Sequence, residues 1–354
     1  MNPFNIAVLA GDGIGPEVTE EAIRVVDAAA ERDEARFRWT RYPWNSDYYR
    51  THGRMAPADY LDQLRSHDAI FLGAIGDPAI QDHVTLNGLL LPIRREFDQY
   101  VCLRPSYLFD GIESPLRGKK AGEIDILVLR ENTEGEYANI GGRLYNHTSH
   151  EVAVQSALFT RRGCERIMRA AFDWAGRRRG KVTSITKSNA QGYGMVLWDE
   201  VFDRVKADFP KIKTESILID RAAMDFVRRP ESFDVVVASN LFGDILTDLA
   251  AILVGSMGLA ASGNINPERT APSMFEPVHG SAPDIAGKGI ANPLAAILAG
   301  AMMLEHLGLS RAARAIHNAV AGVLKAGSPR TPDLAGSATT GEVGEAVLAR
   351  LQGP

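Results

Sequence analysis

Residues 6–17 read Ile6-Ala7-Val8-Leu9-Ala10-Gly11-Asp12-Gly13-Ile14-Gly15-Pro16-Glu17, and this stretch narrows the choice of fold. An apolar run that ends in glycines and leads into helical periodicity over 17–31 predicts a strand, a glycine turn and a helix. The dinucleotide fingerprint of the Rossmann fold has its third glycine three residues after the second, and that place holds Pro16 here. We therefore reject the ordinary Rossmann fold and keep the turn as a candidate for backbone contact with a ligand.

Strand-like and helix-like patterns alternate along the rest of the chain. Predicted strands lie at 37–42, 69–73, 124–129, 182–186, 214–219 and 235–238. Predicted helices lie at 57–65, 155–178, 193–208, 221–228 and 241–254, and, beyond a glycine- and proline-rich stretch, at 293–306, 310–325 and 340–351. This alternation predicts an α/β fold with a largely parallel sheet. Because no linker divides the chain, a two-domain arrangement requires the chain to cross between domains more than once.

The composition is that of an ordinary globular enzyme, with 354 residues, 45% hydrophobic and 23% charged. A net charge of −5 argues against a nucleic-acid partner. The two cysteines, Cys102 and Cys164, form no C-x-x-C motif, which argues against a disulfide framework or a thiolate zinc site. The N-terminus lacks the basic segment followed by an apolar core that is typical of a secretory signal. The longest apolar run, 293–304, is too short to span a bilayer. We expect a cytoplasmic protein with no membrane partner.

Two carboxylates stand four residues apart in the segment 239–249, Ser-Asn-Leu-Phe-Gly-Asp-Ile-Leu-Thr-Asp-Leu. On a helix, this spacing puts Asp244 and Asp248 on one face with Cβ atoms about 5–6 Å apart. Hard oxygen ligands of this kind suit Mg²⁺ or Mn²⁺. The alternative is a solvated helix face, on which the helix dipole favours Asp244 in the first turn.

Other charged residues fit an acidic substrate. Arg94, Arg104 and Arg130 stand beside apolar stretches. One arginine is most often a surface charge, but several that converge suit a di- or tricarboxylate, because guanidinium binds carboxylate in a bidentate manner. Lys187 follows the strand 182–186, at the strand end where open α/β sheets bind ligands, and suits a general base. Asp220 also follows a strand and is a third candidate metal ligand.

The segment 275–293 is dense in small residues and turn formers but carries isolated polar groups. Small residues let backbone N–H groups approach a phosphate or an adenine closely. The alternative is a rigid loop that caps the helix after Pro293.

Taken together, these motifs resemble the β-decarboxylating dehydrogenases, the relatives of isopropylmalate, isocitrate, homoisocitrate, and tartrate or D-malate dehydrogenases. The matching segments span nearly the whole chain: 11–17, Arg94 and Arg104, 130–137, 187–189, Asp220, 240–248 and 276–293. The resemblance implies an α/β, isopropylmalate-dehydrogenase-like, non-Rossmann fold of two domains with a large mixed, mostly parallel sheet. A discontinuous dinucleotide-binding domain would comprise 1–99 and 255–354. A central domain for substrate, metal and dimerisation would comprise 100–254.

The same resemblance implies oxidation of a 2-hydroxy acid by hydride transfer to NAD, loss of the β-carboxylate as CO₂, and protonation of the enol. It assigns substrate binding to Arg94, Arg104, Arg130 and Asn189, and Mg²⁺ or Mn²⁺ binding to Asp220, Asp244 and Asp248. It makes Lys187 the base and Tyr137 the acid. It assigns the dinucleotide to Glu276, His279, Gly280, Ser281, Ala282, Asp284, Ile285 and Asn292. Asp284 would accept hydrogen bonds from the ribose and repel a 2′-phosphate, which favours NAD over NADP, and K⁺ is a further candidate ion.

Family members are obligate homodimers, so the resemblance implies that Lys187 and Asp220 enter the site from the neighbouring subunit. Residues 130–137, Arg-Glu-Asn-Thr-Glu-Gly-Glu-Tyr, favour the isocitrate, homoisocitrate and tartrate/D-malate branches, and 83–93 lacks the Ser-x-Asn-x-x-x-Arg pattern of isocitrate enzymes. D-malate or tartrate is the first expectation and 3-isopropylmalate the second. Two other classes stay open: a catalytically silent regulatory subunit, and a nucleotide-binding module without hydride transfer.

Overall fold

The computed structural model describes residues 3–353, which form two compact units. Unit 1 contains residues 3–99, 104–124 and 250–353, and unit 2 contains 100–103 and 125–249. The segments 104–124 and 250–254, expected in the central domain, lie in unit 1. For the first segment, the reason is packing: the carbonyl of Gly111 accepts a hydrogen bond from Arg330, and a Cβ on Gly111 would lie 2.2 Å from the carbonyl oxygen of Leu324.

Ten strands form one sheet in the order β2-β1-β3-β12-β11-β4-β5-β10-β8-β9, and β6 and β7 form a second, two-stranded sheet. The strands are β1 (Phe4–Gly11), β2 (Phe37–Arg41), β3 (Ala69–Ala74), β4 (Val101–Tyr107), β5 (Asp125–Glu131), β6 (Gly135–Leu144), β7 (Val152–Leu158), β8 (Lys181–Thr186), β9 (Lys213–Leu218), β10 (Val235–Ala238), β11 (Ala261–Ile265) and β12 (Ser273–Pro277). Six neighbouring pairs, β1–β2, β1–β3, β3–β12, β5–β10, β10–β8 and β8–β9, are parallel, and β11–β12 is antiparallel. The predicted α/β class with a mostly parallel sheet is confirmed.

Nine predicted helices are present, with ends that differ by up to six residues, and the helices within 46–52 and 82–96 were not predicted. The helices are α1 (Gly15–Ala30), α2 (Ser46–His52), α3 (Tyr60–Arg65), α4 (Asp82–Thr85), the π-helix η2 (Leu86–Leu90), α5 (Leu91–Glu96), α6 (Arg161–Gly176), α7 (Gly194–Lys206), α8 (Ile219–Arg228), α9 (Asn240–Leu253), α10 (Leu294–His306), α11 (Ser310–Ala326) and α12 (Thr340–Gln352). Short 3₁₀ turns lie at η1 (Glu31–Asp33), η3 (Pro230–Ser232), η4 (Met257–Leu259) and η5 (Pro332–Leu334). None of the helices between residues 3 and 353 has the length and apolar character needed to cross a membrane.

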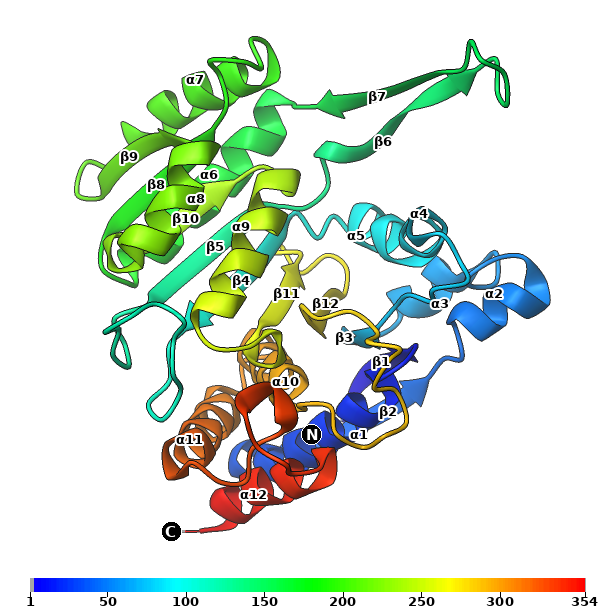
Figure 1. Ribbon diagram of the computed structural model, residues 1–354, viewed down its shortest axis with the longest axis vertical. Helices are drawn as coiled ribbons and strands as arrows, with labels where there is room; N and C mark the ends of the chain where they lie inside the picture. The colour runs from blue at the N-terminus through cyan, green and yellow to red at the C-terminus, as the bar shows by residue number, and fades with distance from the viewer. Residues whose placement is uncertain (1–2, 354) are drawn as a thin grey trace. The chain divides into compact units, whose positions relative to one another are not determined.

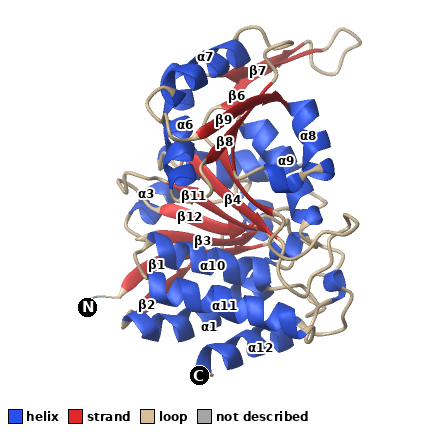
Figure 2. Cartoon of the chain, turned by 90° about the vertical axis from the view of Figure 1, so that its left-hand side faces the viewer, coloured by secondary structure: helices blue, strands red, loops and turns tan. Residues whose placement is uncertain are grey.

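In unit 1, apolar layers cover both faces of the sheet. All six residues of β3 are buried, as expected of a parallel strand between two layers. Helices α1, α10, α11 and α12 gather beside the strands of this unit (Figure 2). A hydrophobic core cluster in this unit joins Leu9 and Leu72 of the strands to Tyr60, Leu89 and Phe97.

In unit 2, strands β5, β10, β8 and β9 carry α6 and α7, with α6 in contact with β5, β10 and β8 (Figure 1). The strand Val235–Ala238 is fully buried. Helix α9 begins at Asn240, two residues after this strand ends. The start of α9 therefore stands at the carboxyl end of a parallel strand, where open α/β sheets bind ligands.

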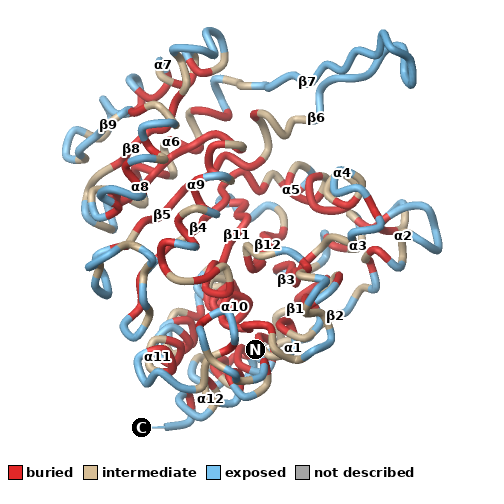
Figure 3. Tube along the Cα trace, viewed as in Figure 1, coloured by how far each residue is buried: buried red, intermediate tan, exposed pale blue. Residues whose placement is uncertain are grey.

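Strands β6 and β7 form an arm that extends from unit 2 (Figure 1). Every residue from 139 to 158 is exposed (Figure 3), including Leu144, Tyr145 and Val154. The prediction of a helix from residue 155 was wrong, because α6 begins at Arg161. Thr160 caps it by accepting a hydrogen bond from the backbone N–H of Gly163, and residues 155–158 pair with β6 instead.

Five strands, β4, β6, β7, β11 and β12, were not predicted. Strands β11 and β12 lie in the glycine- and proline-rich stretch that the sequence pattern indicates as loop. Glycine and proline weaken any strand prediction, yet β12 pairs with β3 on one side and β11 on the other, in the middle of the sheet.

Candidate active site

Helix α9 carries the two carboxylates that the sequence places four residues apart. The Asp244 side chain is 31% exposed, and Asp248 is exposed. Phe242 and Leu246 of the same helix are buried, so their side of α9 packs in the protein interior. The carboxylates therefore occupy the accessible face of an anchored helix.

Asp244 does not have the contacts of an ordinary solvated carboxylate. Its Oδ1 forms an ion pair with Nη1 of Arg130, and its Oδ2 accepts a hydrogen bond from the hydroxyl of Tyr137 at 3.0 Å. Arg130 is buried, and its Nε and Nη2 donate to Oδ1 of Asn240 at 2.9 and 2.7 Å. We call these four side chains, from β5, β6 and α9, the α9 network. The structure thus gathers Arg130, Tyr137 and Asp244, three of the residues that the sequence singled out.

The close fit of Arg130 on α9 depends on Gly243. A Cβ at this position would lie 2.7 Å from Cβ and 2.8 Å from Cγ of Arg130, closer than real Cβ atoms approach other atoms. Only glycine therefore leaves room for the arginine to lie flat on the first turns of the helix. This explains the glycine beside Asp244 in a helix that would otherwise favour alanine.

Lys187 and Asp220 form a second cluster. Nζ of Lys187 lies 2.5 Å from Oδ1 of Asp220, where β8 and β9 end. The hydrogen bond from the Lys187 ammonium lowers the pKa of the Asp220 carboxyl, which is exposed. Asn189 follows in the exposed turn after β8. Lys187, Asn189 and Asp220 therefore lie on the surface of unit 2.

The three predicted metal ligands do not form one group within a single chain. Among residues 3–353, no three histidine, cysteine or acidic side chains lie close enough together to hold a metal ion. Asp244 and Asp248 remain a two-carboxylate set on α9, and their hard oxygens fit Mg²⁺ or Mn²⁺. A complete site requires further oxygens, from water, substrate or a second chain.

In unit 1, the predicted substrate residue Arg94 contacts the predicted cofactor residue Glu276. Nη2 of Arg94 donates to Oε1 of Glu276 at 2.8 Å, and Nδ2 of Asn264 donates to the same oxygen at 2.7 Å. Both ionic side chains are buried. Arg94 follows the π-helix Leu86–Leu90, an irregularity found frequently at functional sites. Arg104 is also buried, on β4.

The predicted dinucleotide loop, 276–292, is tied to the glycine turn after β1. The backbone N–H of Ile14 donates to the carbonyl of Ser281 at 2.9 Å. Gly13 has a φ of +57°, and a Cβ there would lie 1.9 Å from this carbonyl oxygen. The carboxylate of Asp12 accepts hydrogen bonds from Ser46 and Gly76. The glycine turn thus contacts the loop through its backbone. The N–H of Ile14 and the carboxylate of Asp12 both have hydrogen-bond partners within the protein.

The side chains of this loop differ in accessibility. Asp284 and Gly280 are exposed, Ile285 and Ala282 are partly buried, and Ala282 has the uncommon φ of +40°. An exposed carboxylate next to an apolar side chain fits the hydroxyls of a ribose and the absence of a 2′-phosphate.

Two other side chains of the loop are less accessible. Burial lowers the pKa of His279, whose Nδ1 lies 3.0 Å from the carbonyl oxygen of Gly280. The amide of Asn292 donates to Asp333 at 3.0 Å and accepts from the backbone N–H of Leu294 at the start of α10. The Asn292 side chain thus serves the fold.

Sequence reasoning gave no role to Asn240 or to three glutamates of the segment 130–137. Glu131 is buried, and its carboxyl accepts hydrogen bonds from the backbone N–H groups of Thr133 and Glu134 and from the Thr133 hydroxyl. Burial raises the pKa of Glu131 to about 7. The sequence feature that could have pointed to these residues is the density of polar residues in 130–137, a short connection between two strands.

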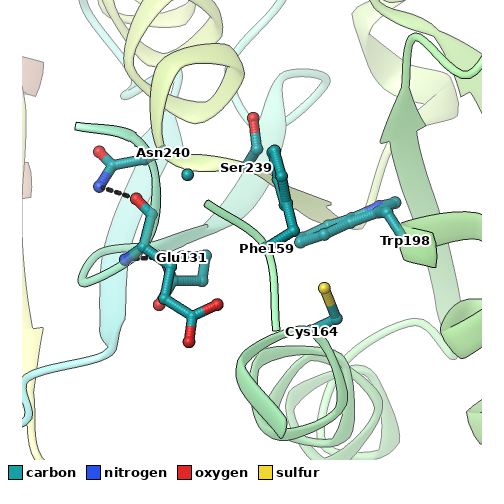
Figure 4. A pocket seen from close by; sticks show the side chains of 8 residues that line it. Glu131, Phe159, Cys164, Trp198, Ser239 and Asn240 are labelled. Carbon is teal, nitrogen blue, oxygen red and sulfur yellow. Dashed lines mark hydrogen bonds between the residues drawn. The ribbon is translucent and has the colours of Figure 1, made fainter. Parts of the chain in front are cut away.

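A small pocket lies beside this connection. Glu131 and Asn240 lie on one side of it, and Cys164 and Trp198 lie on the other (Figure 4). The space between them does not admit a water molecule. Burial raises the pKa of the Cys164 thiol to about 12, so the thiol stays protonated and is not a nucleophile. The pocket is part of the packing behind the α9 network and not a ligand site.

The chain matches the model of the isocitrate/isopropylmalate dehydrogenase family over residues 5–347. It is 51% identical over 354 residues to the D-malate dehydrogenase [decarboxylating] of Escherichia coli (strain K12), with 98% of each chain covered. It is 49% identical over 360 residues to the tartrate dehydrogenase/decarboxylase of Pseudomonas putida, also with 98% of each covered. The crystal structure of isocitrate dehydrogenase from Methylococcus capsulatus superposes with a TM-score of 0.89 at 36% identity, covering 99% of this chain and all of that one. The chain belongs to the isocitrate/isopropylmalate dehydrogenase family.

Proposed function

We propose that this protein catalyses the oxidative decarboxylation of a small 2-hydroxy dicarboxylic acid, D-malate or tartrate, with NAD as hydride acceptor and Mg²⁺ or Mn²⁺ as the divalent cation. The observation that carries the proposal is the α9 network. In it, the phenol of Tyr137 and the guanidinium of Arg130 both contact Asp244, a carboxylate suited to a divalent cation. The identities to the D-malate and tartrate enzymes support the choice of a four-carbon acid.

Each charged side chain has a role in this reaction. Arg94, Arg104 and Arg130 bind the substrate carboxylates, with Asn189 as a further polar contact. Arg130 gives one donor to Asp244, so a substrate carboxylate competes with Asp244 for that donor. Lys187, in its neutral amine form, accepts the proton of the C2 hydroxyl. After the C3–C4 bond breaks and the β-carboxylate leaves as CO₂, the hydroxyl of Tyr137 gives a proton to C3.

When bound, the divalent cation stabilises negative charge on the C2 oxygen, and NAD takes the hydride from C2. Asp244 and Asp248 of one subunit would hold the cation. Asp220 of the partner subunit would complete the set of carboxylates. The loop residues His279, Gly280, Ser281, Ala282, Asp284, Ile285 and Asn292 would hold the dinucleotide, and K⁺ would be an accessory ion. Because Glu276 is already paired with Arg94, we expect its effect on the dinucleotide to be indirect.

The burial of three leucines supports a small acid over 3-isopropylmalate. Leu89, Leu90 and Leu91 are at most 7% exposed, and the first two pack in the core of unit 1 with Tyr60 and Phe97. An isopropyl group needs an apolar lining that is open to the substrate. Leucines committed to the core do not supply one.

We further propose a homodimer in which Lys187 and Asp220 serve the site of the partner subunit. Unit 2 exposes apolar side chains on two helices, with Met224 and Val227 of α8 and Ile245 of α9 each at least 45% exposed. The arm of β6 and β7 is a two-stranded hairpin, which is marginal on its own in water. A second copy of unit 2 would cover these surfaces and also bring Asp220 towards Asp244 and Asp248.

A cytoplasmic location agrees with the two cysteines, which are buried and not joined in a disulfide. Neither acts as a metal ligand in the proposed site.

The testing experiment is NADH formation by the purified protein with Mn²⁺ across D-malate, the tartrate stereoisomers, 3-isopropylmalate, isocitrate and homoisocitrate. We expect the highest kcat/KM with a four-carbon acid. A higher kcat/KM with 3-isopropylmalate would overturn the substrate assignment. NAD binding without reduction for every acid would identify a nucleotide-binding module or a silent subunit.

A further inference from the structure

The segment 130–137 contains one carboxylate that contacts α9 and has no part in the proposed reaction. The Oε1 of Glu136 accepts a hydrogen bond from the hydroxyl of Ser239 at 3.1 Å, and its Oε2 accepts one from the backbone N–H of Leu241 at 3.2 Å. Ser239 and Leu241 flank Asn240, the first residue of α9. Glu136 therefore clamps the start of the helix from outside it.

A carboxylate suits this position for two reasons. The first N–H groups of a helix have no partner within the helix, and the aligned peptide dipoles make this end positive. Ser239 is fully buried and Leu241 is partly buried, which limits the access of water to these donors. The contact is therefore worth more than the same hydrogen bonds on an open surface.

The other glutamates of the segment make different contacts. Glu134 is bound at the start of α6, where it accepts from the backbone N–H and the hydroxyl of Thr160 at 2.9 and 2.6 Å. Glu131 binds the turn that follows it. Of the three, Glu136 is the one whose carboxylate contacts the helix that carries Asp244.

Tyr137 follows Glu136 directly and reaches the same helix one turn further on. Its hydroxyl donates to Asp244 at 3.0 Å. Two consecutive residues of β6 thus contact α9 at two points, the first at Ser239 and Leu241 and the second at Asp244. With the first point fixed, the backbone of Tyr137 has little freedom to move along or away from the helix.

We propose that Glu136 is a positioning residue that, by binding the start of α9, holds the hydroxyl of Tyr137 against Asp244. This role deepens the proposed function, since it takes Tyr137 as the proton donor. Loss of the Glu136 carboxylate leaves every group of the proposed chemistry present but misplaces the phenol. Misplacement by about 1 Å is known to cost on the order of 100-fold in rate.

The first test reads the position of Tyr137 without any substrate. Protein labelled with 3-fluorotyrosine contains nine tyrosines, and the ¹⁹F resonance of Tyr137 is assigned by its absence in Tyr137→Phe. Glu136→Gln should shift or broaden this resonance, and Ser239→Ala should do so to a smaller extent. The matched control, Glu200→Gln, removes an exposed glutamate of unit 2 that pairs with Arg161 at 3.4 Å, and should leave the resonance in place.

The second test is a split between kcat and KM for the best acid of the substrate screen. Glu136→Gln should lower kcat roughly tenfold and change the KM of the acid by less than about twofold, because the groups that bind substrate remain. Glu136→Asp, which keeps the charge on a shorter side chain, should recover part of the loss. Thermal unfolding of each variant shows whether the fold is intact.

An unshifted Tyr137 resonance in both Glu136→Gln and Ser239→Ala overturns the proposal, and so does a rise in KM at unchanged kcat. If no acid gives NADH with the wild-type protein, the proposed function fails. The ¹⁹F comparison then still decides whether Glu136 positions Tyr137.

Discussion

The hydroxyl of Tyr137 donates to the Asp244 carboxylate at 3.0 Å, so the expected proton donor and an expected metal ligand share a hydrogen bond. Tyr137→Phe should lower kcat with the best acid by roughly 100- to 1,000-fold, because it removes the proton for C3. Asp244 keeps its ion pair with Arg130, so the fold should be unaffected. Steady-state NADH and keto-acid formation measure this effect. Tyr107→Phe, on β4, serves as the control and should behave as wild type.

Removal of one carboxylate from α9 should weaken the cation site and spare the fold. Asp248→Asn should raise the Mn²⁺ concentration for half-maximal activity by at least about tenfold, since a neutral amide is a poorer ligand for a hard cation. Isothermal titration with Mn²⁺ alone provides a readout without turnover. The control is Asp203→Asn, whose side chain is 67% exposed in the same unit. Equal Mn²⁺ affinity in the two variants would remove Asp248 from the site.

A site shared between subunits predicts complementation between two inactive variants. Lys187→Ala and Asp244→Asn should each be inactive alone. After they are mixed and allowed to exchange subunits, half of the dimers are hybrids, and one of the two sites in each hybrid is intact, which gives about one quarter of wild-type activity. The measurement is NADH formation after exchange, with the double variant as control. A mixture as inactive as its components would place Lys187 and Asp244 in the same subunit's site.

The buried Glu131 predicts a pH dependence of stability. Its pKa is about 7 in the folded protein against an ordinary 4.5, so the folded state binds the proton more tightly. The free energy of unfolding should therefore fall as pH rises from about 4.5 to about 7, by roughly 3 kcal/mol from this residue. Glu131→Gln cannot titrate and should lose this decline.

Urea unfolding of both proteins at pH 5 and pH 8 measures this effect. The difference between variant and wild type cancels other groups, such as the partly buried His306, whose pKa is lowered by burial to about 4. If the free energy of unfolding changes equally with pH in the two proteins, Glu131 has an ordinary pKa.

The backbone contact between Gly13 and Ser281 predicts a specific effect on the dinucleotide. Gly13→Ala would place a methyl group 1.9 Å from the carbonyl oxygen of Ser281 in a backbone conformation that L-residues rarely adopt. The loop 276–292 must then shift, and the KM for NAD should rise by about tenfold or more while that of the acid changes little. Gly53→Ala, with φ +67° and open space around it, controls for backbone strain alone. If Gly13→Ala leaves the KM for NAD unchanged, the loop 276–292 does not contribute to NAD binding.

The sequence predicted those parts of the site that depend on local spacing and on strand ends. Asp244 and Asp248 lie on one helix face because a four-residue spacing has a fixed meaning on a helix. Lys187 and Asp220 meet because neighbouring parallel strands end at the same edge of a sheet. The alternation of strands and helices was sufficient for the fold class.

Contacts between distant segments could not be predicted in the same way. Arg94 and Glu276 are 182 positions apart, and nothing in either local pattern indicates that they form a buried ion pair. The arm of β6 and β7 was missed because all its residues from 139 to 158 are exposed, so it lacks the buried face that makes a strand recognisable. Strands β11 and β12 are specified by their neighbours in the sheet more than by their own glycine- and proline-containing sequences.

The place of β12 in the sheet affects how the protein is made. Met274 and Phe275 pair with Ile70 and Phe71 of β3, so one edge of β3 is filled by residues translated about 200 positions later. At the usual speed of a ribosome, this delay is roughly 10–40 s. During that time β3 presents an apolar strand with unpaired backbone groups, the type of surface that attracts other nascent chains. The residues 125–249, continuous in sequence, are complete before that edge is closed. The emerging chain therefore exposes this edge of its first strands until its last third has been synthesised.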